Sequence, residues 1–197
     1  MPDELARLTE FVYEMGLLKR YKRSGWLVAG VVAPESIADH SFRAAVLAGV
    51  LAALEGANPE RAILLSLFHD SQETRLTDLP YLAKRYVTRM PNEQVTADQV
   101  RGLPAPVADL ITGSVAEYER RTSLEARCAR DADKLECLLQ AIEYRDQGHH
   151  TIQPWIDSSL AALQTPTGKK LADEALATGS LDWLPGVVNG EDEPAAG

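Results

Sequence analysis

Apolar residues recur every three or four positions along most of the chain, which is the spacing of an amphipathic helix. Near the N-terminus, Leu5, Leu8, Val12 and Met15 follow this spacing, and Gly16 is a residue typical of a helix end. We therefore expect the chain to begin with a helix that ends near residue 16.

Residues 36–55 carry the clearest helix pattern in the sequence. Ser36 is a favoured N-cap residue, and Asp39 stands three positions later, as in a capping box. Gly56 is then placed to end the helix. Within the segment, large apolar residues recur every four positions: Phe42, Val46, Val50 and Leu54.

Three further helices are predicted along the rest of the chain. They run over about residues 60–73, from Pro104 or Pro106 to about residue 120, and from Thr122-Ser123 to about residue 147. In the first of them, four apolar residues are expected to face the core: Ile63, Leu64, Leu67 and Phe68.

Strand signals are nearly absent. Only residues 26–33 could be extended, and Pro80 and Pro91 mark a stretch of short helix and loop. From residue 184 onward, glycine, proline and acidic residues combine without periodicity, which predicts disorder. The fold expected is all-α, with one helical bundle over residues 1–183 and a flexible acidic tail over residues 184–197.

The composition excludes several classes of protein. With 29 acidic and 20 basic residues, the chain has a formal net charge of −9, which argues against binding to nucleic acid or to an anionic membrane. Cys128 and Cys137 are too few for a disulfide framework or a cysteine-based zinc module. The N-terminus lacks a signal-peptide pattern, and the longest stretch without a polar side chain, residues 44–54, is too short to cross a bilayer. We expect a soluble cytoplasmic protein.

The four histidines fall into two pairs. His149 and His150 stand beside Gly148 at a predicted helix end, where a solvated turn is the simplest interpretation. His40 and His69 instead lie within apolar segments that are predicted to be helical. The second pair is therefore the better candidate for chemistry.

Acidic residues accompany these two histidines. Asp70 follows His69 directly, and both Asp131 and Asp133 lie in an otherwise apolar helical stretch, where an unpaired acid is costly. Two imidazoles and two carboxylates could share one divalent ion, and this mixed set suits Mn²⁺, Co²⁺, Fe²⁺ or Ni²⁺ better than Ca²⁺ or Mg²⁺. The residues alone leave open which of the two later aspartates takes part.

The spacing of these residues carries a family resemblance. His69-Asp70 follows His40 after 28 residues, and Asp133 comes after 62 more. This order, with ESIADHSFRAAVLA, LFHDSQE, TDLP and DADKLECLLQAIEY, is similar to the HD-domain metal-dependent phosphohydrolases, and especially to their 5′-deoxynucleotidase branch. The resemblance spans about residues 21–144. It implies His40, His69, Asp70 and Asp133 as ligands of one divalent metal, with Co²⁺ or Mn²⁺ favoured and Fe²⁺, Ni²⁺ or Zn²⁺ as alternatives.

The resemblance also implies catalytic and sugar-binding acids. Asp70 and Glu73 match catalytic acids of the family, with Glu73 handling protons near the scissile phosphate. Glu73 stands four residues after His69, so the two side chains are expected on one face of one helix. Asp78 matches an acid that holds the sugar 3′-hydroxyl group.

Arg23 and Trp26 match a basic and aromatic pair that binds phosphate and crowds the sugar 2′ position. Bacterial members carry this pair adjacent, whereas Ser24-Gly25 separates it here. A physical argument also favours phosphate binding, because residues 19–23 hold four basic residues in an acidic chain and a guanidinium can bind phosphate in a bidentate manner.

The predicted function is hydrolysis of deoxyribonucleoside 5′-monophosphates to the deoxynucleoside and phosphate. Three alternatives stay open: a nucleoside triphosphate triphosphohydrolase, a dinuclear iron oxygenase that would need His149 or His150 as ligands, and a metal-bearing interaction protein without turnover. We expect no nucleic-acid partner and, because relatives of this kind tend to be dimers, a homodimer.

Overall fold

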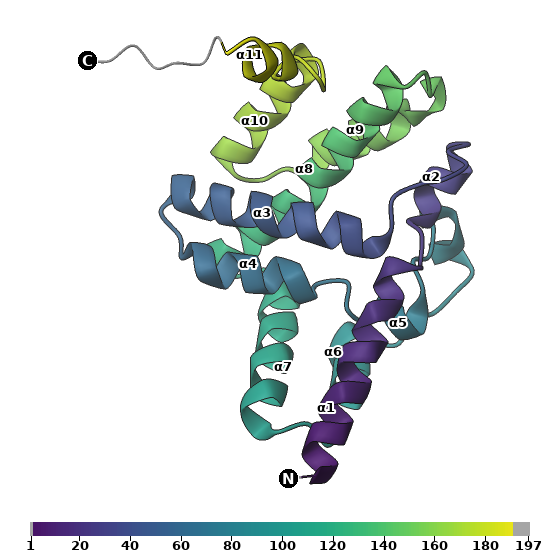
Figure 1. The fold of residues 1–197 in the computed structure, drawn as a ribbon, viewed down its shortest axis with the longest axis vertical. Helices are drawn as coiled ribbons and strands as arrows, with labels where there is room; N and C mark the ends of the chain where they lie inside the picture. The colour runs from purple at the N-terminus through teal and green to yellow at the C-terminus, as the bar shows by residue number, and fades with distance from the viewer. Residues whose placement is uncertain (1, 191–197) are drawn as a thin grey trace.

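The computed structural model describes residues 2–190, and within that range it contains helices and no strand (Figure 1). The all-α fold predicted from the sequence is therefore confirmed. In chain order the elements are α1 (Pro2–Met15), η1 (Gly16–Lys19), α2 (Ser24–Val28), α3 (Ile37–Glu55), α4 (Pro59–Phe68), α5 (Glu73–Leu76), η2 (Tyr81–Arg85), α6 (Asn92–Gln99), α7 (Ala105–Arg120), α8 (Leu124–Asp146), η3 (His150–Ile152), α9 (Gln153–Ala162), α10 (Pro166–Ala177) and α11 (Leu184–Asn189).

The stretch that could have been extended, residues 26–33, begins as the last part of α2. An isolated bridge between Lys22 and Ser36 lies just outside it. Beside this bridge, the N–H group of Arg23 donates to the carbonyl oxygen of Glu35 at 3.1 Å. These contacts hold the segment before α2 against the start of α3.

Helix α3 lies at the centre of the bundle, against α8 and α4. The predicted capping box is present: the Asp39 N–H donates to Ser36 Oγ at 3.1 Å, and the Ser36 N–H donates to the Asp39 carboxylate at 2.8 Å. Small residues are fully buried on both helices, which favours close packing: Ala44, Ala48 and Ala52 in α3, and Ala129 and Ala132 in α8.

The row of large apolar residues on α3 faces the outside of the molecule. Phe42 and Leu54 are 70% and 64% exposed, and Val46 and Val50 between them are about half exposed. Because alanines and His40 occupy the core side of α3, the four-residue repeat marks the outer side of this helix.

Helix α4 is shorter than the sequence predicts. It ends at Phe68, and residues 69–72 form a turn before α5 begins at Glu73. Ile63 and Leu67 were expected to face the core, but they are 38% and 44% exposed, so this part of the prediction is wrong. The residues of α4 that the core covers are Ala62, Leu65 and Ser66.

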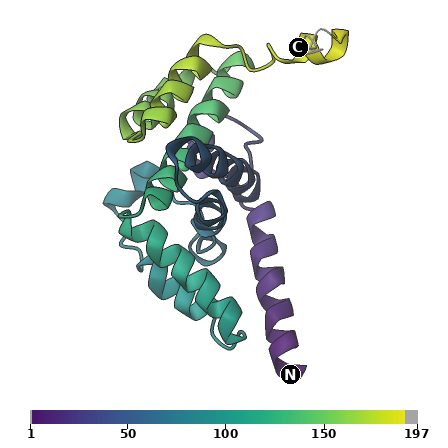
Figure 2. The same ribbon diagram turned by 90° about the vertical axis from the view of Figure 1, so that its left-hand side faces the viewer.

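Figure 2 shows α1 on one side of the molecule and α7 on the other, with α3 and α4 seen nearly end-on between them. The predicted N-terminal helix is confirmed as α1, which packs through Phe11 into a small apolar cluster with Ile111 of α7. Leu5 and Val12 of the predicted apolar face are exposed instead.

The C-terminal helices extend the bundle over α8, since both α9 and α10 contact it. Part of the segment expected to be disordered is helical: Leu184–Asn189 form α11, with a proline in its first turn and Gly190 at φ 70° as its end. The rest of the expected acidic tail, residues 191–197, lies outside the described residues.

Within the described part of the chain, α3 is also the one helix whose length and apolar composition would suit a membrane span. Its inner face packs on α8 and α4 and carries the buried His40. These contacts are those of the central helix of a bundle, and they account for the apolar residues on the inner face of α3 but not for the exposed row from Phe42 to Leu54.

Asp131 fastens the start of α10 to α8. Its buried carboxylate accepts hydrogen bonds from the N–H groups of Gln164 and Thr165, at 3.0 and 2.7 Å, and from the Thr165 hydroxyl at 2.7 Å. A Cβ atom on Gly168 would lie 2.8 Å from Asp131 Oδ2, so the close approach requires glycine there. Asp131 therefore has a structural partner for each of its oxygens.

We predict that Asp131→Ala lowers the free energy of unfolding by about 2–3 kcal/mol, because buried donors lose an anionic acceptor. Urea denaturation followed by circular dichroism measures the change. Asp157→Ala is the matched control: its exposed carboxylate accepts from Gln153 at 2.8 Å, and its loss should cost less than about 0.5 kcal/mol. Equal stability of the two variants would contradict the anchoring role of Asp131.

Candidate metal centre and substrate cavity

Four side chains from separate parts of the chain converge at one buried point. His40 comes from α3, His69 and Asp70 from the turn after α4, and Asp133 from α8. His40 Nε2 lies 3.4 Å from His69 Nε2, 3.7 Å from Asp70 Oδ2 and 3.4 Å from Asp133 Oδ1. His69 Nε2 lies 3.1 Å from the same Asp70 oxygen. The structure thus brings together the four residues that the resemblance implies as ligands.

The hydrogen bonds of the two imidazoles leave their Nε2 atoms available to a cation. The Nδ1 atom of His40 donates to the Glu136 carboxylate, and that of His69 donates to the carbonyl oxygen of Ser66 at 2.6 Å. A proton on Nδ1 places the lone pair on Nε2. At bond lengths of about 2.1 Å, the ligands of a first-row divalent ion lie about 3–3.5 Å apart when adjacent and about 4.2 Å apart when opposite, a range that includes the 4.0 Å between His69 Nε2 and Asp133 Oδ1. The residues therefore fit one divalent transition metal.

Glu136 lies behind His40 and links it to Arg43. One of its oxygens accepts from His40, and the other accepts from Arg43 Nε and Nη2 at 3.0 and 2.9 Å. Arg43 also donates to Glu143 at 2.5 Å. The sequence offered one signal for this network: Glu136 and Arg43 each follow a metal-ligand candidate by three positions, on the same helical face.

Two cations accompany the two aspartates. Arg23 Nη1 lies 3.2 Å from Asp70 Oδ2, and Lys134 Nζ lies 2.9 Å from Asp133 Oδ2. Burial opposes the charge on Asp70, but His69 and Arg23 outweigh it and hold the pKa of Asp70 below its ordinary value. Burial is likewise outweighed at Asp133, chiefly by Lys134, and its pKa is also lowered. Both carboxylates are therefore anionic.

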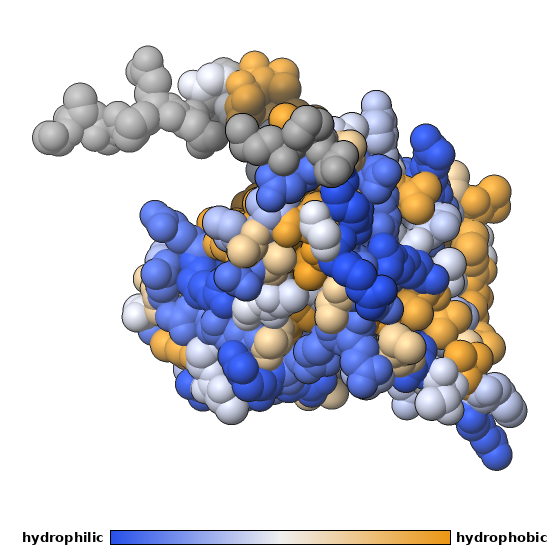
Figure 3. Space-filling view, turned by 90° about the horizontal axis from the view of Figure 1, so that it is seen from below, coloured by the Kyte–Doolittle hydropathy of each residue, from blue (hydrophilic) through white to orange (hydrophobic). Residues whose placement is uncertain are grey.

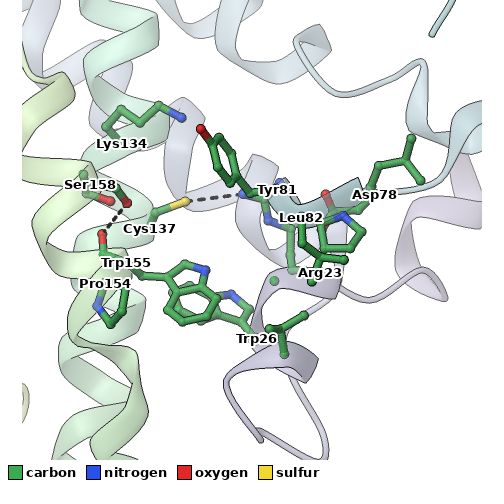
Figure 4. Close-up of a pocket in the computed structure, with 15 residues that line it drawn as sticks. Arg23, Trp26, Asp78, Tyr81, Leu82, Lys134, Cys137, Pro154, Trp155 and Ser158 are labelled. Atoms are coloured by element: carbon green, nitrogen blue, oxygen red, sulfur yellow. Dashed lines mark hydrogen bonds between the residues drawn. The ribbon is translucent and has the colours of Figure 1, made fainter. Parts of the chain in front are cut away.

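Figure 4 shows a cavity of about 750 Å³ that is lined by Arg23 and Lys134, the partners of Asp70 and Asp133, but not by the four converging side chains themselves. Its walls come from α8 and α9 on one side, and from α2 and residues 78–82 on the other. Two cations line this cavity and pair with the aspartates of the ligand set: Arg23 with Asp70, and Lys134 with Asp133. Figure 4 also shows the Arg23 guanidinium directed at Cys137, whose Sγ accepts from Nη2 at 3.3 Å.

Asp78 and Trp26 line the cavity, and each is held by a neighbour. Asp78 Oδ2 accepts from the Ser24 N–H at 2.6 Å, and the Trp26 indole donates to Glu35 at 2.8 Å. Thr77, just before Asp78, has φ 58° and ψ 163°, a combination that glycine adopts far more easily than threonine. The hydrogen bond from Ser24 and the backbone conformation of Thr77 therefore both restrain the Asp78 carboxylate.

Glu73 is the first residue of α5, so the prediction that it shares a helix with His69 is wrong. Burial raises the pKa of Glu73 to about 9, and the negative charges of Asp70 and Asp78 add to the effect. Its Oε2 atom is buried without a hydrogen-bond partner among the described residues. The turn at residues 69–72 thus still places the Glu73 carboxyl group close to two of the acids of the site.

Other candidate residues lie elsewhere. His149 packs its ring against Tyr144, with centroids 5.9 Å apart, and neither it nor His150 joins the converging ligands. Of the basic residues within 19–23, all of which are described, Arg23 alone lines the cavity. Lys19 lines a separate hollow on the far side of Glu136.

The chain matches the family model of the HD domain over residues 15–174, which include the four converging side chains. The match covers most of the sequence. The chain belongs to the HD domain family.

Proteins related to this HD domain have names and folds that agree with the match. The chain is 32% identical over 180 residues to the human protein named 5′-deoxynucleotidase HDDC2, covering 89% of this chain and 87% of that protein. It is 32% identical over 143 residues to 5′-deoxynucleotidase hdd1 of Schizosaccharomyces pombe, covering 70% and 72%. A solved structure, a conserved hypothetical protein from Pyrococcus furiosus, superposes with a TM-score of 0.70 at 28% identity, covering 86% and 99%.

We predict that Glu136→Gln weakens Co²⁺ binding to this HD domain about 10- to 100-fold. Glutamine has one acceptor oxygen and no charge, so it cannot serve His40 and Arg43 together. Isothermal titration of the metal-free protein with Co²⁺ measures the change. Glu143→Gln alters the other carboxylate bound to Arg43 and is the matched control; an equal loss in both variants would contradict a role for the His40 contact.

Proposed function

We propose that the chain is a cytoplasmic, metal-dependent phosphohydrolase that converts deoxyribonucleoside 5′-monophosphates to the deoxynucleoside and inorganic phosphate. One observation carries the proposal: Arg23 and Lys134 line a cavity at the point where they pair with the aspartates of the converging ligand set. The names of the human and fission yeast relatives agree with this reaction. Two free thiols, Cys128 and Cys137, suit a reducing compartment.

We propose Co²⁺ or Mn²⁺ as the ion, with His40, His69, Asp70 and Asp133 as its ligands. The donor set of two imidazoles and two carboxylates supports this choice over Ca²⁺ and Mg²⁺. When bound, such an ion polarises a phosphoryl oxygen and acidifies a water molecule. The two aspartates supply the negative charge that retains the ion, while the partner of His40, Glu136, keeps that imidazole in position.

Arg23 and Lys134 bind and orient the phosphate group. Both side chains carry positive charge at the cavity end next to Asp70 and Asp133. They would neutralise the phosphoryl oxygens as water attacks phosphorus and the bond to O5′ breaks, so their contribution is positional and electrostatic. Arg23 has further N–H groups for a bidentate contact with phosphate.

Asp78 and Trp26 position the sugar. The Asp78 carboxylate lines the cavity and is fixed by Ser24, so it is placed to accept a hydrogen bond from the 3′-hydroxyl group. Trp26 is 2% exposed and held by Glu35, so its ring cannot easily move aside for a 2′-hydroxyl group. A rigid wall of this kind supports preference for deoxyribose over ribose.

Glu73 is the proton-handling group in this proposal. Its carboxyl group is buried, lies near Asp70, and keeps one oxygen without a hydrogen-bond partner among the described residues. That oxygen is available to exchange a proton with the attacking water or with the leaving O5′ atom.

The alternative functions find less support. A triphosphohydrolase needs more positive charge, and the described residues that line the cavity include two cationic side chains, Arg23 and Lys134. A dinuclear iron oxygenase needs further ligands, yet His149 and His150 lie away from the site. An interaction protein without turnover would have no need of a large open cavity beside the ligand set.

The deciding experiment compares dAMP, AMP and dATP as substrates of the metal-stripped protein supplied with Mn²⁺ or Co²⁺. We predict phosphate release chiefly from dAMP. Triphosphate released from dATP would move the assignment to the triphosphohydrolase, and no turnover of any of the three would overturn an enzymatic function on nucleotides.

Two variants separate metal binding from catalysis in the same assay. His69→Ala is expected to lose both the ion and turnover, because a ligand is removed. Glu73→Gln is expected to keep the ion and lower kcat about 100-fold, which is typical for removal of a general acid or base. Unchanged kcat in Glu73→Gln would reject its proton-handling role.

We propose further that the protein is a homodimer, with the second copy covering the outer face of α3. A row of four large apolar side chains from Phe42 to Leu54 is exposed there, and contiguous apolar surface of this kind marks interaction sites. Light scattering is expected to show a dimer that Val46→Glu dissociates, whereas Val187→Glu on α11 has no effect. A monomeric parent protein would reject the dimer.

A further inference from the structure

Apart from Arg23, Lys134, Asp78 and two serines, the residues that line the cavity are mainly aromatic and apolar. They include Val28, Pro80, Tyr81, Leu82, Pro154 and Trp155. A nucleotide has a charged end, the phosphate, and a flat end with two apolar faces, the base. Trp155 offers a partner for such a face, on the wall where it lies beside Trp26, whereas Figure 4 shows Tyr81 extending toward Lys134.

Trp155 of α9 is held flat against α2. Its indole lies beside Trp26, with ring centroids 5.8 Å apart and planes inclined by 33°. A Cβ atom on Gly25 would lie 3.0 Å from Trp155 Nε1, so the ring reaches this position because residue 25 is glycine. Gly25 belongs to the Ser24-Gly25 pair that separates Arg23 from Trp26. The extra residues between the phosphate-binding arginine and Trp26 thus make room for a second tryptophan at the cavity wall.

Tyr81 of η2 stands on the opposite wall. Figure 4 shows its ring projecting from residues 78–82 toward the wall formed by α8 and α9. Tyr81 is 86% exposed, and its neighbour Leu82 is 58% exposed. In the view from below, apolar side chains gather along the right-hand margin of the molecule (Figure 3). A flat apolar ligand group between the cavity walls would cover part of the Tyr81 and Leu82 side chains.

We propose that the base of the bound nucleotide stacks on Trp155, in the part of the cavity that lies between Trp155 and Tyr81. The inference rests on the proposed function, because it assumes that the phosphate lies at Arg23. Stacking uses the face of the base, and every base has such a face. Trp155 is suited to this role because Gly25 and Trp26 fix its ring before any ligand arrives, which lowers the entropy lost on binding.

The test compares dAMP with 2-deoxyribose 5-phosphate, which keeps the phosphate and the 3′-hydroxyl group but carries an anomeric hydroxyl group in place of the base. In the parent protein we expect kcat/KM to be at least about 10-fold higher for dAMP. Trp155→Ala should lower kcat/KM for dAMP about 10- to 100-fold and change the value for 2-deoxyribose 5-phosphate by less than about threefold. Trp155→Phe, which keeps an aromatic face, should recover most of the loss.

Trp183→Ala is the matched control, because Trp183 is 61% exposed just before α11 and does not line the cavity. An equal loss on both substrates in Trp155→Ala would show a structural role and overturn the base site. Parent protein that hydrolyses both substrates equally well would overturn it too, while leaving the proposed function intact. No hydrolysis of either substrate would reject the proposed function and this inference together.

Two further variants keep the proposal testable if Trp155→Ala fails to fold. Gly25→Ala displaces the Trp155 ring without removing it, and it should reduce the preference for dAMP over 2-deoxyribose 5-phosphate. Tyr81→Ala changes an exposed side chain on the other wall, and it should reduce the same preference with the folded state intact. An unchanged preference in both variants would overturn the proposal.

Discussion

The hydrogen bond between His40 and Glu136 ties the two central helices together at the point where the ligand candidates converge. A fully buried carboxylate is tolerated only when charged partners satisfy its oxygens, and His40 and Arg43 of α3 do so for Glu136 of α8. The alanine faces of both helices allow the close approach that this contact requires. The position of His40 opposite Asp133 then follows from the packing of the helices.

Helix α8 serves two separate purposes on two of its faces. Asp133 points to the ligand set, while Asp131, two residues earlier, points to the backbone at the start of α10. Residues two apart on a helix face in nearly opposite directions, so one acidic stretch can hold a metal on one side and a scaffold on the other. Of the two aspartates that composition and burial alone could not separate, it is Asp133 that lies with the two histidines.

Many of the helices could be predicted from the sequence, because capping residues and apolar spacing act locally. Ser36 and Ser123 start α3 and α8 as predicted, and the four ligand candidates meet as the family resemblance implied. The sequence could not predict which face of α3 is buried, because both faces are apolar. The alanine face is buried because of tertiary packing. The end of α4 at Phe68 was missed because helical periodicity continues past it. Trp155 belongs to no motif, and only the fold brings it beside Gly25.

The strained backbone at Thr77 lowers the stability of the fold next to Asp78, a residue that lines the cavity. A threonine in this glycine-like conformation costs about 1–3 kcal/mol, and the rest of the fold must absorb that cost. The residue that follows is Asp78, held by Ser24 across the chain. Glycine at position 77 would remove this backbone strain, but its greater conformational freedom would restrain the Asp78 carboxylate less. Thermal stability and a fixed position of the Asp78 carboxylate would therefore favour different residues at position 77.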